Sequence, residues 1–405
     1  MNKTLGTTLL VSGTMIGAGM LAMPLTSAGI GFTFTVFLLI ALWLLLTYSA
    51  LLFVEVYQTT ESDSGIGTLA ALYFGNAGRI FATTVMFVFL YALLAAYVSG
   101  GGEILLRAAQ DAGVVADTGS FAGLSPEMTQ KLCVALFTVF FGAFVIISTK
   151  VVDGFNRLLF LVMLLALLAV IGVMFPNITL HNLTAMPLDS LLLVSASPIF
   201  FTAFGFHGSI PSLNKYLDGN VRALRFAILT GSAITLVCYI LWQLSTHGVL
   251  AQNEFTQILN EKKNLDGLIE ACRRITGSNT ITAAVQIFSA LALITSFLGV
   301  ALGLFDCIED MLRKGLNIKA GRALLGALTF IPPLFCAYYL NFSAALGYAG
   351  QMFAFFAVVL PVGLVWRARR RHPNLPYRVA GGDAALLLAL VLGIGIACVP
   401  FFISS

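Results

Sequence analysis

The chain has 405 residues, of which 59% are hydrophobic and only 10% carry a charge. About a quarter of the residues of an ordinary soluble domain are charged, so this composition excludes a soluble protein and indicates a polytopic membrane protein. The formal net charge of +4 is small for this length and by itself indicates no partner.

Eleven segments are long and apolar enough to cross a membrane, since a spanning helix needs about 20 predominantly apolar residues. In chain order they are 4–29, 31–57, 79–107, 130–149, 154–175, 189–217, 222–248, 279–310, 322–340, 343–366 and 384–403. The sequence therefore predicts an all-α polytopic membrane protein of eleven transmembrane helices, in a single domain that covers residues 1–405.

Two of these segments are interrupted. The first carries Gly13, Gly17, Gly19 and Pro24, and the sixth is broken at 203–208. In lipid every backbone N–H and C=O group must find a partner, so a spanning helix with a break needs a reason. One alternative is a flexible helix that packs through its glycines. The other is a discontinuous helix whose freed backbone groups bind a solute.

The position of the breaks favours the second alternative. Each interrupted segment is followed by four further spans, and because five is odd the second set of five is inverted relative to the first. Interruptions at corresponding positions of inverted repeats point to the binding site of a secondary transporter. We therefore predict two inverted repeats, at about 4–175 and 189–366, followed by an extra C-terminal helix at about 384–403.

The loops predict the orientation of the chain. Most of the 22 lysine and arginine residues fall on the side of the N-terminus, so the positive-inside rule predicts a cytoplasmic N-terminus and a periplasmic C-terminus. The basic run 366–371 is interpreted as a topology anchor. Residues 58–78 include a candidate short helix on the membrane surface. Apolar residues at helical spacing in 249–278 predict two amphipathic helices that form a lid, with a plain solvated loop as the alternative.

Several stretches resemble known transporters. Residues Thr14–Met20 resemble the first-helix signature of the amino acid/polyamine/organocation transporters. Longer stretches resemble the bacterial aromatic amino acid permeases, namely 91–97, 204–212, 295–306 and 346–350. Within that family, 53–58 and 216–220 are more similar to the tyrosine-specific than to the tryptophan-specific members. The resemblance covers nearly the whole chain.

The resemblance implies a leucine-transporter-type fold and proton-coupled symport of L-tyrosine, or a related aromatic amino acid, across the bacterial inner membrane. It implies no cofactor and no nucleic-acid partner. Alternatives are a broader aromatic or tryptophan transporter, sodium coupling, or a channel. A membrane-embedded enzyme is not indicated, because the sequence has no H-E-x-x-H motif and no phosphate-binding loop. We expect alternating access, in which spans 1, 2, 6 and 7 rock against spans 3, 4, 8 and 9.

A zwitterionic amino acid brings one carboxylate and one ammonium group into a medium of low dielectric, where each must be matched. Backbone N–H groups at the start of the second half-helix suit the carboxylate, and unwound carbonyls suit the ammonium group. Aromatic side chains near the breaks are candidates for the side-chain pocket, or else belong to ordinary membrane core. The predicted substrate-binding residues are Thr14, Met15, Gly17, Ala18, Gly19, Met20, Tyr91, Tyr97, Ala203, Phe204, Gly205, Phe206 and Ser296.

Proton coupling needs a group that changes its charge. His207 is the only ionisable residue predicted near the bilayer centre, while Glu103, Glu55 and Asp306 lie nearer to the ends of their spans. An ionisable residue inside a membrane is a functional candidate, and histidine titrates in the useful range; a neutral structural histidine is the alternative.

No metal site built from cysteine or histidine is predicted. The hydroxyls of Thr295 and Ser296, together with the carbonyls of Gly13 and Ile16, resemble the sodium site of sodium-coupled relatives. Packing of serine and threonine between helices is the alternative.

Overall fold

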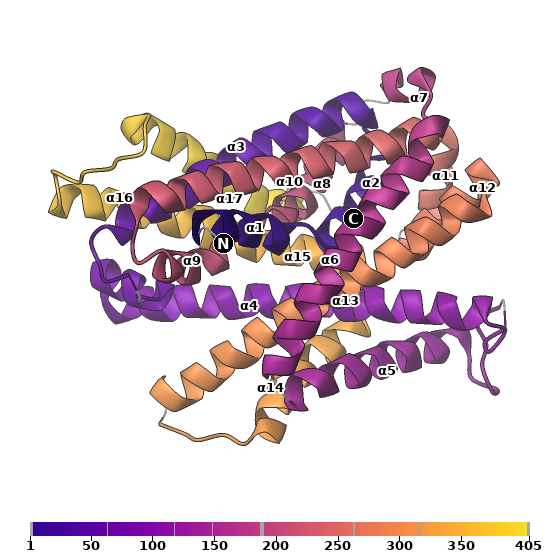
Figure 1. Cartoon of the computed structure of the whole chain (residues 1–405), viewed down its shortest axis with the longest axis horizontal. Helices are drawn as coiled ribbons and strands as arrows, with labels where there is room; N and C mark the ends of the chain where they lie inside the picture. The colour runs from indigo at the N-terminus through magenta and orange to yellow at the C-terminus, as the bar shows by residue number, and fades with distance from the viewer. Residues whose placement is uncertain are drawn as a thin grey trace.

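The computed structural model describes residues 3–62, 64–116, 118–147, 149–186, 190–261, 264–315 and 317–402. Residue 189, where the second predicted repeat begins, and residue 403, where the last predicted span ends, lie outside these ranges. Within them the chain is helical and has no strand; one isolated bridge joins Phe121 and Leu124. Figure 1 shows long helices packed side by side, with the N-terminal helix α1 near the middle of the view.

The helices follow the predicted segments. The predicted segments without a break form α3 (Gly31–Tyr57), α4 (Ile66–Asp111), α5 (Pro126–Ile147), α6 (Thr149–Met174), α10 (Val221–Val249), α13 (Asn279–Asp310), α14 (Arg322–Ala337) and α17 (Gly382–Phe402). The predicted tenth span consists of α15 (Phe342–Ala354), a π-helical segment η5 (Phe355–Val359) and α16 (Leu360–Arg371). Short elements are η2 (Phe175–Asn177), α7 (Leu180–Thr184), α11 (Gln252–Glu261), α12 (Leu265–Thr276) and η4 (Met311–Gly315).

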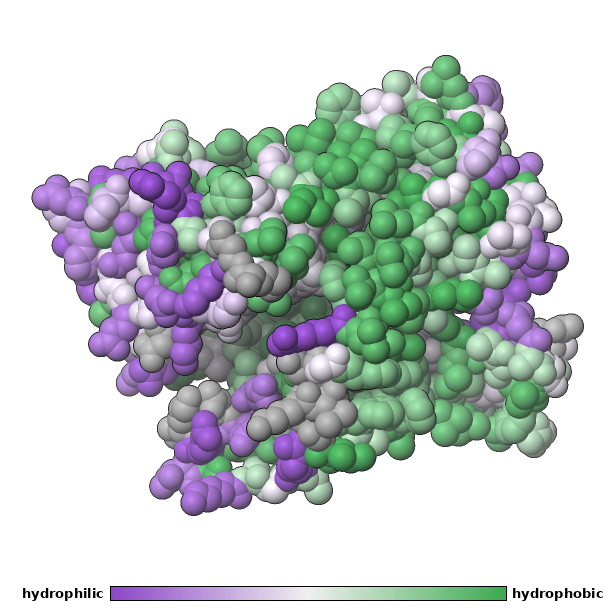
Figure 2. Space-filling view, viewed as in Figure 1, coloured by the Kyte–Doolittle hydropathy of each residue, from purple (hydrophilic) through white to green (hydrophobic). Residues whose placement is uncertain are grey.

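The prediction of a polytopic helical membrane protein is confirmed. In the described part of the chain, 9 helical segments are long and apolar enough to cross a membrane, and the bent pair at the N-terminus raises the number to 10. Helix α14, which contains Pro332 and Pro333, has 16 residues and is shorter than the other spans. Figure 2 shows a broad hydrophobic band across the surface, with hydrophilic residues towards the left and right ends.

Both predicted breaks are present. The first span consists of α1 (Lys3–Met15), the 3-10 turn η1 (Ala18–Leu21) and α2 (Ala22–Ser27), and its two halves are bent by 43°. The sixth consists of α8 (Ser190–Ala203), η3 (His207–Ser209) and α9 (Ile210–Tyr216). The two breaks are in contact. A Cβ atom on Gly19 would lie 3.1 Å from the Cα atom of Ala203, so a larger residue at position 19 would push the two broken segments apart.

The short helix that the sequence predicts within residues 58–78 is the first part of α4. Helix α4 is kinked at Gly75, where φ is 67°, so residues 66–74 form a separate helical piece. Arg367 of α16 donates a hydrogen bond of 2.9 Å to the carbonyl oxygen of Tyr73, and Arg371 donates one of 2.8 Å to that of Leu72. The basic end of α16 therefore holds the last turn of this short helix, where a positive charge also suits the helix dipole.

The long connection between α10 and α13 folds as two amphipathic helices, α11 and α12, which we call the lid helices. Six of their large apolar residues are buried, namely Phe255, Ile258, Leu259, Leu265, Leu268 and Ile269. The prediction of two amphipathic helices is thus confirmed, and the alternative of a solvated loop is wrong. Burial of six large apolar side chains fixes these helices against the bundle.

Candidate functional site

A cavity of about 490 Å³ lies where the two breaks meet. It is lined by residues of α1, α4, α6 and α13 and of the segment between α8 and α9. The lining residues are Leu9, Leu10, Gly13, Thr14, Met15, Ile16, Gly19, Met86, Phe89, Leu90, Leu93, Tyr97, Asn156, Arg157, Phe160, Thr202, Ala203, Gly205, Phe206, Gly208, Ser209, Thr295, Ser296, Gly299, Val300, Gly303, Cys307 and Phe356. Its volume is within the range of ordinary small-molecule sites, roughly 300–1,000 Å³.

The cavity opens towards the side on which α1 begins. Leu9 and Leu10, in the middle of α1, line it and are about half exposed, and Gly303 lines it near the end of α13 and is exposed. Figure 2 shows a hollow near the middle of the displayed face. On the opposite side of the breaks, Trp242 and Phe288 are fully buried, with ring centroids 5.3 Å apart. The site is therefore closed on the side of the lid helices.

The ends of the two first half-helices are joined by one hydroxyl group. Tyr239 Oη of α10 lies 2.7 Å from the carbonyl oxygen of Met15 and 2.7 Å from that of Ala203. The hydroxyl has a single proton, so it donates to one carbonyl at a time. Two carbonyl oxygens thus converge at the end of α1 and the end of α8. This arrangement suits a group with several donors, such as an ammonium group.

The start of the second half-helix of the first span offers a backbone donor. The Ala18 N–H donates to Ser296 Oγ of α13 (2.9 Å). A Cβ atom on Gly17 would lie 2.4 Å from the same oxygen, so glycine permits this approach. Trp242 Nε1 donates to the carbonyl oxygen of Met20 (3.0 Å) and fixes the turn from the far side. A backbone N–H at a helix start that already meets an oxygen is suited to a carboxylate.

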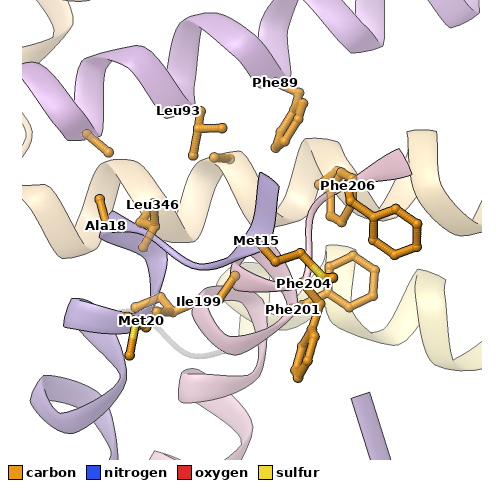
Figure 3. Close-up of a cluster of buried hydrophobic side chains, with 14 of the residues drawn as sticks. Met15, Ala18, Met20, Phe89, Leu93, Ile199, Phe201, Phe204, Phe206 and Leu346 are labelled. Carbon is orange, nitrogen blue, oxygen red and sulfur yellow. The ribbon is translucent and has the colours of Figure 1, made fainter. Parts of the chain in front are cut away.

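Only one face of α4 reaches the cavity. Phe89, Leu93 and Tyr97 follow one another at intervals of four residues and line it, and Figure 3 shows Phe89 and Leu93 projecting from α4 towards the break. Tyr91 does not line the cavity; its hydroxyl donates to the carbonyl oxygen of Leu328 in α14 (2.8 Å).

Of the aromatic residues at the second break, Phe206 lines the cavity. Phe204 lies behind the lining, in edge contact with Tyr239 at 5.0 Å between ring centroids. Gly17, Ala18 and Met20 are also not among the lining residues.

His207 is buried but faces away from the cavity. Its Nε2 atom lies 2.8 Å from Ser49 Oγ of α3, and its ring centroid lies 4.9 Å from that of Phe206 and 5.3 Å from that of Phe353. No partner is present for Nδ1 among the described residues. The predicted histidine therefore lies between the second break and α3 rather than in the cavity.

Glu103 is buried beneath the lid helices. Its carboxylate accepts a hydrogen bond of 3.1 Å from the N–H of Leu265, the first residue of α12. One turn further along α4, Arg107 lies 3.3 Å from a carboxylate oxygen of Asp266 and 3.9 Å from one of Glu270. Helix α12 is thus tied to α4 by both residues on the closed side of the molecule.

Glu55 is fully buried and forms an ion pair with Arg369. Its two carboxylate oxygens accept from Arg369 Nε (2.6 Å) and Nη2 (2.8 Å) of α16, and one of them also accepts from the Val379 N–H (2.8 Å). The pair joins α3 to α16 and to the segment after it. Asp306 lies near the end of α13, three residues from the cavity-lining Gly303, and is exposed.

All four residues of the predicted sodium site line the cavity. The Thr295 hydroxyl donates to carbonyl oxygens of its own helix, those of Leu291 (2.9 Å) and Ala292 (3.1 Å), and Ser296 accepts from Ala18. No group of three or more His, Cys, Asp or Glu side chains suited to a metal ion occurs in the described ranges.

Some of the lining and supporting residues were not among those predicted from the sequence. Phe89 and Leu93 precede Tyr97 by eight and four residues, and this helical spacing is a signal that would have found them. Tyr239 and Trp242 lie three residues apart on one face of α10, and each carries a hydrogen-bond donor within an apolar segment. Asn156 also lines the cavity and its buried Oδ1 has no partner in the described chain; nothing in the sequence distinguishes it.

The fold and the site define a polytopic helical membrane protein with a solute-sized cavity at two broken helices, the arrangement of a transporter. The family model described as "Tryptophan/tyrosine permease family" matches residues 1–400. The chain belongs to this family, whose members are amino acid permeases and not enzymes.

Three relatives illustrate the similarity. The chain is 63% identical to "Tyrosine-specific transport system 1" and 50% identical to "Tyrosine-specific transport system 2", both of Haemophilus influenzae. These matches cover 100% and 99% of the chain and 98% and 97% of the relatives. "Glutamine transporter 2" of Aliivibrio fischeri is 33% identical, with 97% of each chain covered.

Proposed function

We propose that this permease is a proton-coupled symporter that imports L-tyrosine across the bacterial inner membrane by alternating access. One observation carries the transport proposal: the carbonyls of Met15 and Ala203 converge at one end of the cavity, and the Ala18 N–H stands at the other half-helix. The carbonyl oxygens carry a partial negative charge and the N–H group a partial positive charge, which suit the ammonium and carboxylate groups of an amino acid.

The proposed architecture is eleven spans in two inverted repeats with an extra C-terminal helix, with the N-terminus in the cytoplasm. Breaks in the first and sixth predicted spans support the inverted repeats. In this orientation the cavity opens to the cytoplasm and the lid helices cover the periplasmic side. The opposite state would then arise by movement of the spans that carry the breaks.

Tyrosine as substrate is supported by the names of the two relatives at 63% and 50% identity. The relative named for glutamine indicates that the shared backbone site does not by itself select a side chain. Phe89, Leu93 and Phe206 give the cavity an aromatic and apolar wall, and the unpartnered Oδ1 of Asn156 is an acceptor for a phenol hydroxyl. A site that binds a substrate hydroxyl discriminates strongly against the analogue that lacks it.

For proton coupling, Glu103 is the candidate that the geometry favours. It is a buried carboxyl group that accepts a hydrogen bond from the N–H of Leu265, the first residue of lid helix α12, so its protonation would change the hold on the lid. Glu55 is paired with Arg369 and is less suited to release a charge.

Uptake of labelled tyrosine into proteoliposomes tests the proposal. We expect accumulation above the outer concentration when an inward proton gradient is imposed, and loss of that stimulation in Glu103→Gln. Equal stimulation by a sodium gradient would instead favour coupling at Gly13, Ile16, Thr295 and Ser296. Equal competition by tryptophan and phenylalanine would mean a broader aromatic transporter, and equilibration without accumulation would mean a channel.

A further inference from the structure

A second buried histidine, His247, lies at the closed side of the molecule. It is two residues from the end of α10 and is fully buried. Its Nε2 atom lies 2.8 Å from Ser27 Oγ of α2, and its Nδ1 atom lies 3.2 Å from Gln252 Oε1, at the start of lid helix α11. The imidazole thus bridges the outer half of the broken first span and the lid.

The neighbouring groups fix which ring nitrogen carries a proton. The side-chain amide of Gln252 donates through Nε2 to the carbonyl oxygens of His247 (3.2 Å) and Leu250 (3.3 Å), so its Oε1 atom faces the ring. A carbonyl oxygen only accepts, so Nδ1 of His247 is a donor. The protonation state of the ring is therefore decided at Nε2.

Both protonation states of Nε2 can be satisfied. Ser27 Oγ lies 3.4 Å from Gln243 Oε1, so a charged ring donates to Ser27 and the Ser27 hydroxyl donates onward to Gln243. In the neutral ring the Ser27 hydroxyl reverses and donates to Nε2. Gln243 Nε2, which has no partner among the described residues, then donates to Ser27 after rotation of the amide.

His207 differs in this respect. The Ser49 hydroxyl donates to the carbonyl oxygen of Leu46 (3.0 Å), so Ser49 accepts from Nε2 of His207. A second proton on this ring would be placed on Nδ1, which has no partner in the described chain. Burying a donor without an acceptor is costly, so the surroundings of His207 hold one neutral form.

We propose that His247 is a proton-binding residue that keeps the site closed on the side of the lid helices. The charged imidazole holds lid helix α11 to α2, and loss of its proton weakens this contact. Charge-assisted hydrogen bonds are roughly twice as strong as neutral ones, so protonation strengthens both bonds of the bridge. Because α2 continues from η1, which begins at Ala18, the bound proton and the bound carboxylate stabilise the same half-helix.

Few charged groups surround this bridge. The residues of α2 and η2 include no titratable side chain, and those of α3 near the contact with Phe32 include none. The titratable or charged groups on the other elements packed at this end are His181 of α7, Glu254 and Glu261 of α11, Asp266, Glu270, Cys272, Arg273 and Arg274 of α12, and Glu103, Arg107 and Asp111 of α4. His181, Glu254 and Glu261 are exposed.

The first test is transport, which rests on the proposed proton coupling. Stimulation of tyrosine uptake by an inward proton gradient is measured for wild type, His247→Gln and the matched control His207→Gln. Glutamine keeps a neutral donor and acceptor, so we expect tyrosine counterflow without a gradient to persist in His247→Gln while stimulation by the gradient falls to about onefold. His207→Gln should keep the wild-type stimulation. Wild-type stimulation in His247→Gln would overturn the inference and leave the proposed function intact.

The second test does not need coupled transport. Cys272 is fully buried in lid helix α12, so its alkylation, in a variant whose other cysteines are replaced, reports opening of the lid. Without any gradient, the alkylation rate of the wild-type lid should rise with pH through a midpoint that His247→Gln lacks. Ser27→Ala removes the acceptor of the charged ring and should lower this midpoint by about one pH unit. Identical profiles in all three would refute the inference, even where the gradient fails to drive wild-type uptake.

Discussion

The Tyr239 hydroxyl lies 2.7 Å from the carbonyl oxygen of Met15, and it makes a contact of the same length with that of Ala203. One side chain of α10 therefore holds together the ends of two half-helices that are 188 residues apart in the sequence. Removal of this hydroxyl leaves both carbonyls without that donor.

Tyr239→Phe should raise the KM for tyrosine about tenfold, the equivalent of about 1.4 kcal/mol, which is the size of one hydrogen bond. The ring contact with Phe204 is kept, so the variant should fold. Uptake kinetics measure the effect, and the elution profile in size-exclusion chromatography is the control. An unchanged KM would mean that these carbonyls do not help to bind the substrate.

Gly17→Ala should abolish most transport, because the added methyl group would lie 2.4 Å from Ser296 Oγ. The double variant Gly17→Ala with Ser296→Gly removes the clashing atom and should recover part of the activity. Initial uptake rates of the two variants and of Ser296→Gly alone give the comparison. If the second substitution rescues nothing, the loss has another cause than this contact.

Leu93→Ala should change the relative uptake of tyrosine and smaller amino acids, because Leu93 lines the cavity. Tyr91→Phe on the same helix is the matched control, since Tyr91 bonds to Leu328 outside the cavity; its selectivity should stay that of wild type. Competition assays with a panel of amino acids measure both. A selectivity change in Tyr91→Phe but not in Leu93→Ala would mean that the other face of α4 meets the substrate.

Glu55→Gln should destabilise the protein by about 3–5 kcal/mol, since it leaves the Arg369 guanidinium without its carboxylate. The side chain of Glu55 is fully buried and that of Arg369 is 13% exposed, so solvent does not replace the lost partner. Thermal unfolding in detergent should show a clear drop in Tm. The exposed pair of Lys3 and Asp218 is the control, and Asp218→Asn should leave Tm unchanged.

Burial raises the pKa of the Cys272 thiol to about 12, so the group stays protonated between pH 7 and pH 9. Its alkylation should be on the order of a thousandfold slower than that of a free cysteine, whose pKa is about 8.5. The rate should rise with pH as the thiolate fraction rises. Maleimide labelling of a variant with Cys272 as its single cysteine, compared with the same chain in SDS, checks this. Equal rates in the two conditions would show that α12 does not cover the thiol.

Much of the fold could be predicted because membrane helices must satisfy their own backbone hydrogen bonds. Long apolar runs therefore fix the spans, and the breaks at Gly17 and 203–208 stand out from them. The lid helices could be predicted because apolar residues recur at helical spacing among polar neighbours within each helix. These residues are Phe255, Ile258 and Leu259 in α11 and Leu265, Leu268 and Ile269 in α12. The predicted ninth span, 322–340, is longer than α14, which ends at Ala337.

The sequence by itself determined the family, the helical class, the two breaks and the backbone groups that the breaks free. Only the tertiary structure decided which side chains meet at those breaks. Tyr239 reaches Met15 and Ala203, Leu93 rather than Tyr91 faces the cavity, and His247 rather than His207 bridges to the lid. The reason is physical: a membrane helix that is apolar on all sides shows no periodicity to distinguish its faces, so its rotation is set by packing against neighbours far away in the sequence.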